Sequence, residues 1–315
     1  GIFPGVQASW VVSNEPWFAK VRGIDYLRLN VGYDVSGNDD IDYFAARSYF
    51  SAVKFLDAIS GISFENIGNT RLQWETTKRF NVGFETNLIN NRLNLRFNYF
   101  NSKTDHLLTY QALGFLTGIE KNWGNGGSLK NEGFDVTAVG KLVAMKSFQW
   151  ELGLSVGHYK NKITSLADDA TYFDSSVYGA TIRTEVGKPA NMFYGYVTDG
   201  VFSTSEEAAA AALYVLGDNG VDKNYFGAGD MRFVDLNGDH KIDEHDRTFI
   251  GDPNPDIYGN IFTTLAYKRF RLDFNFNYSL GNDVYNYMRS QLEGGSRFMN
   301  QTTALTRRWQ TEGQV

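Results

Sequence analysis

A run of acidic and amide side chains between Phe233 and Arg247 has the spacing of a calcium-binding loop. Counted from Asp235, oxygen-bearing side chains fall at positions 1, 3, 5, 9 and 12, and the residue at position 7 offers its backbone carbonyl. Calcium takes six to eight oxygen ligands, so a segment with this spacing can wrap around the ion. The sequence therefore predicts a structural calcium site with the ligands Asp235, Asn237, Asp239, Lys241, Asp243 and Asp246.

Two positions of this segment depart from the EF-hand pattern. Position 6, normally Gly, is His240, and position 12, normally Glu, is Asp246, whose side chain reaches less far. A different interpretation is a polar turn, closed by hydrogen bonds from Asp and Asn side chains to the nearby backbone. The sequence leaves both interpretations open.

Catalytic chemistry finds little support in the residue types. Residues Gly153-Leu154-Ser155-Val156-Gly157 match the nucleophile elbow of hydrolases, but that motif needs a sharp strand-to-helix turn, and here it lies inside an alternating strand. The chain has no Cys, and its four His residues lack the spacing of a helical zinc motif. We therefore predict that the protein is not an enzyme and has no catalytic residues.

Aromatic side chains are dense in the stretch 161–256, which is expected to be exposed. Exposed rings stack on sugars or anchor a protein partner. The same rings could instead pack the core of the stretch itself. The candidate substrate- or partner-binding residues are Tyr172, Phe173, Tyr178, Tyr194, Tyr196, Tyr225 and Phe226.

The overall charge and hydropathy exclude two classes of protein. The net charge is −6, whereas a nucleic-acid-binding surface is basic. The mean hydropathy is −0.35, and no apolar run approaches the roughly 18 residues of a membrane helix. The nearest run, 208–216, follows Ser205-Glu206-Glu207, which is typical of a helix start, so we expect a short helix in a loop.

Strict alternation of apolar and polar residues dominates the rest of the chain. A period of two places the two sets on opposite faces of a strand. The expected strands are longer than those of most globular proteins and close to the length that crosses a bilayer when tilted. They lie near 6–13, 24–35, 78–89, 92–104, 131–143, 148–160, 257–267 and 270–281.

The connections between these strands alternate in length. Short turns fall at 90–91, 144–147 and 268–269, whereas the stretches 36–77, 105–130, 161–256 and 282–315 are long. Short turns at one end and long loops at the other are typical of an outer-membrane β-barrel, with the long loops extracellular. A soluble β-sandwich has the same alternation, but the strand length and the loop asymmetry favour an antiparallel transmembrane barrel.

In such a barrel the two faces of each strand meet different surroundings. The apolar set is expected to face lipid and includes Leu93, Leu95, Phe97, Phe274 and Phe276. The polar set is expected to face the lumen and includes Glu85, Arg96, Asn98, Asp273 and Asn275.

Short motifs along the chain resemble one known family when taken in order. They are Leu72-Gln73-Trp74-Glu75-Thr76-Thr77, Asn81-Val82-Gly83, Asn131-Glu132-Gly133-Phe134, Asp199-Gly200-Val201-Phe202, the acidic run from Asp235, and Gly281-Asn282-Asp283-Val284-Tyr285-Asn286. The chain thereby resembles the SusC/RagA family of TonB-dependent outer-membrane transporters, nearly from end to end.

The resemblance implies an all-β fold that is part of a barrel of about 22 strands. The chain would be its C-terminal-side part, with the N-terminal plug domain and the final strands absent. The resemblance also implies import of oligosaccharides or peptides across the outer membrane of a Gram-negative bacterium, energy from TonB, and a SusD/RagB-like lipoprotein as partner. The alternative is a soluble or surface-attached β-protein that binds glycan or calcium without transport.

Overall fold

The computed structural model describes residues 1–55, 59–112, 121–295 and 298–314. The chain forms two compact units, each assembled from segments that are distant in sequence. The first unit comprises Gly1–Phe173, Thr184–Ala190 and Asn254–Gly281, and the second comprises Asp174–Arg183, Asn191–Pro253 and Asn282–Val315. No helix within the described ranges is both long enough and apolar enough to cross a membrane.

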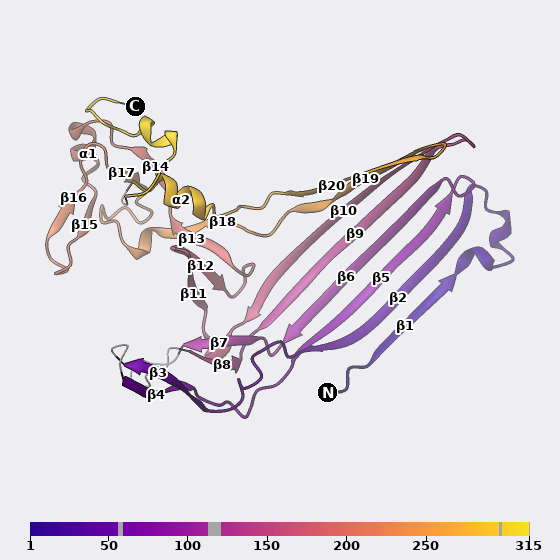
Figure 1. The fold of residues 1–315 in the computed structure, drawn as a ribbon, viewed down its shortest axis with the longest axis horizontal. Coiled ribbons are helices and arrows are strands. Elements are labelled where there is room, and N and C mark those ends of the chain that lie inside the picture. The colour runs from indigo at the N-terminus through magenta and orange to yellow at the C-terminus, as the bar shows by residue number, and fades with distance from the viewer. Residues whose placement is uncertain (56–58, 113–120, 296–297, 315) are drawn as a thin grey trace. The chain divides into compact units, whose positions relative to one another are not determined.

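The first unit is built on an eight-stranded sheet whose strands follow one another in chain order (Figure 1). The order is β1-β2-β5-β6-β9-β10-β19-β20, and all neighbours are antiparallel. This confirms the predicted all-β, up-and-down arrangement. The strands are β1 (Gly5–Val11), β2 (Ile24–Asn38), β5 (Glu75–Leu88), β6 (Leu93–Asp105), β9 (Ser128–Ala144), β10 (Phe148–Ser165), β19 (Ile257–Tyr267) and β20 (Phe270–Leu280).

The predicted strands agree with the observed ones most closely at the short turns. Strand β19 coincides with the predicted 257–267, whereas β9 and β10 continue past the predicted 131–143 and 148–160 toward the long connections. The polar residues there still pair across strands, because backbone hydrogen bonding does not require an apolar face.

Three of the long connections contain strands of their own, and two of these three form short ribbons. The connection 36–77 carries β3 (Tyr49–Phe55) and β4 (Ile59–Asn66), and the connection 105–130 carries β7 (Leu108–Ala112) and β8 (Lys121–Asn125). Each pair forms an antiparallel two-stranded ribbon. These ribbons were not predicted as strands, because their sequences lack a sustained alternation.

The short turns of the sheet depend on left-handed backbone. Asn90 and Asn91 have φ of 57° and 60°, and Lys268 has φ of 54°. Hairpin turns with this handedness match the twist of the flanking strands, and Asn adopts it more readily than most residues. The 90–91 and 268–269 turns therefore reverse the chain as predicted.

The second unit shows that the stretch 161–256 is folded rather than an irregular loop. Its buried core consists of Phe202, Ala208, Leu213 and Ile242. The stretch 161–256 forms sheets with the orders β11-β12-β13-β18, β14-β17 and β15-β16. Their strands are β11 (Tyr172–Val177), β12 (Ala180–Glu185), β13 (Met192–Tyr196), β14 (Thr198–Val201), β15 (Tyr214–Leu216), β16 (Lys223–Tyr225), β17 (Met231–Phe233) and β18 (Arg247–Gly251).

The predicted short helix is present, but it ends sooner than expected. Helix α1 spans Ser205–Ala211 and is capped by Thr204, whose hydroxyl accepts a hydrogen bond from the Glu207 N–H (3.2 Å). It ends because Ala212 turns left-handed, with φ of 52°. The start predicted at Ser205-Glu206-Glu207 is correct to within one residue. The predicted end was wrong, because the apolar run leaves the helix at Ala212 and continues as β15. A second helix, α2, spans Tyr287–Glu293.

Candidate functional site

The polar side chains of the sheet gather on one face, and the strand register shows why. Glu85 of β5 lies opposite Arg96 of β6, which lies opposite Thr137 of β9. Glu85 accepts bonds from two arginines, Arg28 (2.8 Å) and Arg96 (3.3 Å). The predicted polar set, Glu85, Arg96, Asn98, Asp273 and Asn275, lies on this face throughout.

At the far end of the sheet the same face continues on β19 and β20. Asp273 accepts bonds from Arg271 (2.9 Å) and from the hydroxyl of Thr264 (2.5 Å). Asn275 accepts a hydrogen bond from Asn260 (3.3 Å). The polar face therefore holds charges of both signs that are paired across or along the strands.

The opposite face is apolar and largely exposed. The rings of Phe84, Phe97 and Phe134 form a ladder across three strands, with centroids 5.7 and 6.4 Å apart. Phe274 is 44% exposed and Phe276 is 64% exposed. A soluble sandwich would bury such rings in its core, whereas a lipid-facing wall leaves them outward. The structure thus places the predicted apolar set Leu93, Leu95, Phe97, Phe274 and Phe276 on this face.

Two of the hollows in the described part of the chain lie over the strands of the first unit's sheet. One of about 930 Å³ lies over β1, β2, β5 and β6 and is lined by Arg28, Asp34 and Glu85 among others. The other, of about 420 Å³, lies over β5, β6, β9 and β10 and is lined by Phe100, Asp135 and Tyr159 among others. Of these six residues only Glu85 belongs to the predicted polar set. The other five lie at alternate positions of the predicted strands but were not predicted as site residues.

The architecture matches a family known from sequence. A family model described as a TonB dependent receptor-like β-barrel matches residues 25–286. The chain belongs to this family. TonB-dependent receptors form a family of outer-membrane receptors and transporters in Gram-negative bacteria, not a class of enzymes.

Individual relatives agree with this assignment. TonB-dependent receptor P3 of Formosa agariphila is 28% identical over 98% of this chain and 30% of its own length. TonB-dependent receptor SusC of Bacteroides thetaiotaomicron is 26% identical over 90% of this chain and 28% of its own length. The chain thus spans about 30% of the length of the curated relatives that it matches.

The fold is also similar to that of a solved structure. The RagAB peptide transporter superposes with a TM-score of 0.77 and 22% sequence identity, over 98% of this chain and 32% of that chain. At this identity the likeness establishes the fold alone. Together with the family match and the relative SusC, it confirms the predicted resemblance to the SusC/RagA family and the predicted barrel fold.

In this receptor chain the acidic run forms a compact turn closed by its own backbone. The Asp235 carboxylate accepts bonds from the N–H groups of Gly238 (2.7 Å) and His240 (2.8 Å). His240 has φ of 62°, the left-handed conformation that position 6 of a calcium loop requires. Asp239 accepts from the N–H of Lys241 (2.8 Å), and Asn237 accepts from the N–H of Asp239 (3.0 Å).

The end of this turn is fastened by a buried carboxylate. Asp246 is fully buried, and its two oxygens accept from the N–H groups of Leu236 (2.9 Å) and Asp243 (2.9 Å). Asp243 in turn accepts from His245 (2.8 Å) and pairs with the Lys241 ammonium. A reciprocal capping box of this kind holds both ends of the segment together.

The pKa values of two of these carboxyls reflect their bonds. Burial raises the pKa of Asp235, but the hydrogen bonds from the N–H groups of His240, Gly238 and Asp239 have the larger combined effect. The pKa of Asp235 therefore lies below its ordinary value. The Lys241 ammonium is the main cause that lowers the pKa of Asp243. Among the residues that the structure describes, no group of three or more His, Asp or Glu side chains is arranged to hold a metal ion. The carboxylates accordingly hold backbone groups in this conformation.

The candidate aromatic residues fall into two groups. Tyr194 donates to the Arg247 carbonyl (2.9 Å) and lies beneath the Arg183 guanidinium (3.6 Å), while Phe226 and Tyr196 each pack on Phe233. These three rings stabilise the second unit. The other four are more exposed: Tyr172 49%, Phe173 44%, Tyr178 71% and Tyr225 61%. The exposed four remain candidates for binding.

One ion pair in the second unit should make local stability depend on pH. Asp174 accepts two bonds from Arg183, both 2.8 Å, and this pairing lowers the pKa of the Asp174 carboxyl. A carboxyl with a lowered pKa stabilises the folded state at pH values above its ordinary pKa of about 4. This stabilisation is lost as the pH falls below that value and through the lowered pKa. We expect the backbone amides of β11 and β12 to exchange hydrogen faster below pH 4, after correction for the intrinsic rate.

The matched control for this experiment is Asp174→Asn. The amide has no charge to lose, so exchange at β11 and β12 should be faster at pH 7 and should change little more on acidification. An unaltered acid response in the variant would assign the effect to another group.

Proposed function

We propose that this chain forms part of the wall of an outer-membrane importer in a Gram-negative bacterium. The observation that carries the proposal is a single sheet with one polar, charge-paired face and one exposed apolar face. In a closed barrel the apolar face meets lipid and the polar face lines a water-filled lumen. The protein moves its substrate and does not alter it covalently, so no residue acts as a catalyst.

The cargo in this proposal is an oligosaccharide or a peptide too large for simple diffusion through a pore. The lumen-facing residues Glu85, Arg96, Asn98, Asp273 and Asn275 carry donors and acceptors suited to either cargo. The proposal is supported by the relative SusC, which is named a TonB-dependent receptor, and by the similar fold of RagAB, which is named a peptide transporter. Energy would come from TonB, acting through a plug domain.

The partner in this proposal is a SusD/RagB-like surface lipoprotein. It would dock on the extracellular side, where the long connections 36–77, 105–130, 161–256 and 282–315 emerge. Tyr178 and Tyr225 of the second unit are 71% and 61% exposed, and exposed tyrosines are common anchors at protein interfaces. Their exposure supports this side as the docking surface.

Uptake and co-purification together test this proposal. Deleting the gene should abolish growth on one class of polymer, glycan or peptide, and a protonophore that collapses TonB energy should stop uptake by the wild-type cell. The full-length protein, purified in detergent from its native membrane, should bring a lipoprotein with it. Recovery of the protein alone would contradict the partner, and a monodisperse protein without detergent would favour the soluble β-protein.

Calcium binding by the acidic run is a separate part of the proposal. The five side-chain ligands would have to exchange their present backbone hydrogen bonds for the ion, with ligand oxygens at about 2.3–2.6 Å. We expect calorimetry on the full-length protein to show one calcium site, and Asp239→Ala to weaken it at least tenfold. No heat at saturating calcium would leave the segment as a turn held by its own hydrogen bonds.

A further inference from the structure

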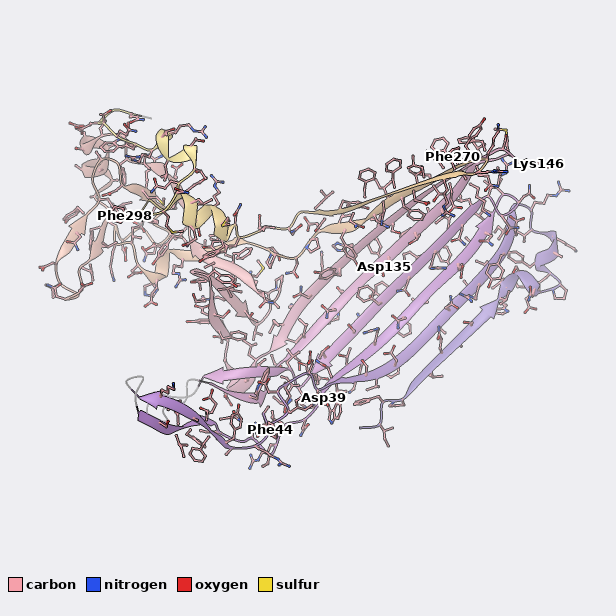
Figure 2. All side chains as sticks on the ribbon, in the orientation of Figure 1. Asp39, Phe44, Asp135, Lys146, Phe270 and Phe298 are labelled. Atoms are coloured by element: carbon pink, nitrogen blue, oxygen red, sulfur yellow. The ribbon has the colours of Figure 1, made fainter. Side chains whose placement is uncertain are left out.

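The smaller hollow of the sheet lies where glycines and aromatic residues share the polar face. Reading across the strands, Phe100 of β6 pairs with Gly133 of β9, and Gly133 pairs with Tyr159 of β10. These positions lie on the half of β9 and β10 that leads into the long connections. Figure 2 labels Asp135, two residues along β9 from Gly133, on the sheet of the first unit.

Rings cover the glycines and form the floor of this hollow. The Phe100 ring occupies the space that a Cβ on Gly133 would need, with its Cζ 2.7 Å from that position. One row further, the Tyr258 ring lies over Gly157 in the same way. Tyr159 packs against Tyr258 with ring centroids 5.8 Å apart. Because glycine has no side chain, the rings lie close to the sheet and leave the space above them open.

Polar groups surround this aromatic floor. The Tyr258 hydroxyl donates to Asp135 (3.1 Å), which leaves the second Asp135 oxygen available as an acceptor. The side chains of Asn98 and Asn131 also line the hollow, and neither has a side-chain hydrogen bond within the described part of the chain. Each amide offers both donors and an acceptor. Arg79 lines the hollow and is exposed, so the hollow carries one cation and one anion.

We propose that this hollow, lined by Phe100, Tyr159, Asp135, Asn98 and Asn131, binds one sugar ring of a neutral oligosaccharide. The inference rests on the proposed import function and names its substrate class. The C–H face of a pyranose packs against aromatic rings, and its neighbouring hydroxyls are both donors and acceptors, like the amides around the floor. The volume of about 420 Å³ suits one or two such rings.

The same residues suit a peptide less well. A peptide in extended form pairs its backbone with a free strand edge, and the four strands under this hollow are all paired on both sides. A site for a charged peptide would need an excess of the opposite charge in its lining. In this hollow the positive charge of Arg79 and the negative charge of Asp135 cancel. Peptide binding is therefore the competing outcome of the test.

The test uses the full-length transporter in detergent with a panel of neutral oligosaccharides and a library of short peptides. We expect a neutral oligosaccharide to bind, and Phe100→Leu to weaken that binding about tenfold, because leucine keeps an apolar side chain but removes the flat ring. Asn131→Leu, which removes an amide with no protein partner, should weaken it as well. Phe97→Leu is the matched control: it makes the same change three residues away on the apolar face, and binding should not change.

The outcomes separate this inference from the proposed function. Uptake of a peptide, with no oligosaccharide bound, would overturn the sugar site and leave the importer standing. Equal glycan affinity in Phe100→Leu and Phe97→Leu would also overturn it. Absence of any uptake defect after gene deletion would instead overturn the importer. Heat-modifiable migration on gels checks that each variant assembles. If Phe100→Leu does not assemble, the glycan affinity of Asn131→Leu tests the sugar site instead, and an unchanged affinity would overturn it.

Discussion

Replacing Phe97 with Arg should make folding into a bilayer less favourable by about 2–4 kcal/mol. Phe97 lies in the middle of β6, on the apolar face, between the rings of Phe84 and Phe134. A guanidinium there would be exposed to hydrocarbon, and its nearest cross-strand neighbours, Phe84 and Val136, cannot pair with it. The measurement is reversible folding of the full-length protein in lipid vesicles, followed by heat-modifiable migration.

The adjacent residue provides the control for this experiment. Asn98 belongs to the polar face, so Asn98→Arg adds the same charge one position along the same strand. The free energy of folding of this variant into the bilayer should change by less than about 1 kcal/mol, because its guanidinium is exposed to water. If Asn98→Arg were the costly change and Phe97→Arg the neutral one, the faces would be assigned the wrong way round and the barrel interpretation would fail.

Replacing Asp246 with Ala should destabilise the acidic run by about 3–5 kcal/mol. The carboxylate is fully buried and accepts two backbone N–H bonds, from Leu236 and Asp243. Each hydrogen bond to a charged group contributes about 1.5–3 kcal/mol, and its loss leaves a buried donor without a partner. Amides in 235–246 should therefore exchange at least about a hundredfold faster in the full-length protein.

Asp239→Ala, measured in the presence of a chelator, is the comparison. Asp239 is exposed, and its carboxylate closes only a local turn to Lys241 and Asn237. Water replaces those bonds, so the change should cost about 1 kcal/mol. Equal acceleration in both variants would mean that the segment opens without breaking the Asp246 bonds, contrary to the role given to them here.

The alternation of side chains was enough to predict the strands and their two faces. In β6 and β20 every second residue is apolar, and a strand places successive side chains on opposite sides whatever its neighbours are. The family could likewise be recognised from motifs such as the one at Asn131. The helix cap was predicted one residue late, at Ser205 instead of Thr204. The ribbon strands β3, β4, β7 and β8 were missed, because short ribbons depend on a few local bonds that leave little trace in a hydropathy pattern.

For the acidic run, too, the sequence predicted one part of the structure and the folded backbone determined the rest. Its spacing indicated a loop that turns tightly around oxygen atoms, and the left-handed His240 agrees with that. The hydrogen-bond partners of these oxygens depend on the folded backbone. Spacing alone would treat Asp246 as one ligand among six. In the structure Asp246 is the buried carboxylate that joins both ends of the segment.

By itself, the sequence determined that the chain is an antiparallel sheet with one polar and one apolar face, since side-chain direction in a strand is a local property. Only the tertiary structure decided which residues of that polar face are neighbours. Glu85 meets both Arg28, 57 positions away, and Arg96, and the Phe100 ring lies over Gly133. These contacts follow from the register between strands, which is set by all the paired backbone bonds together and cannot be read from any one strand.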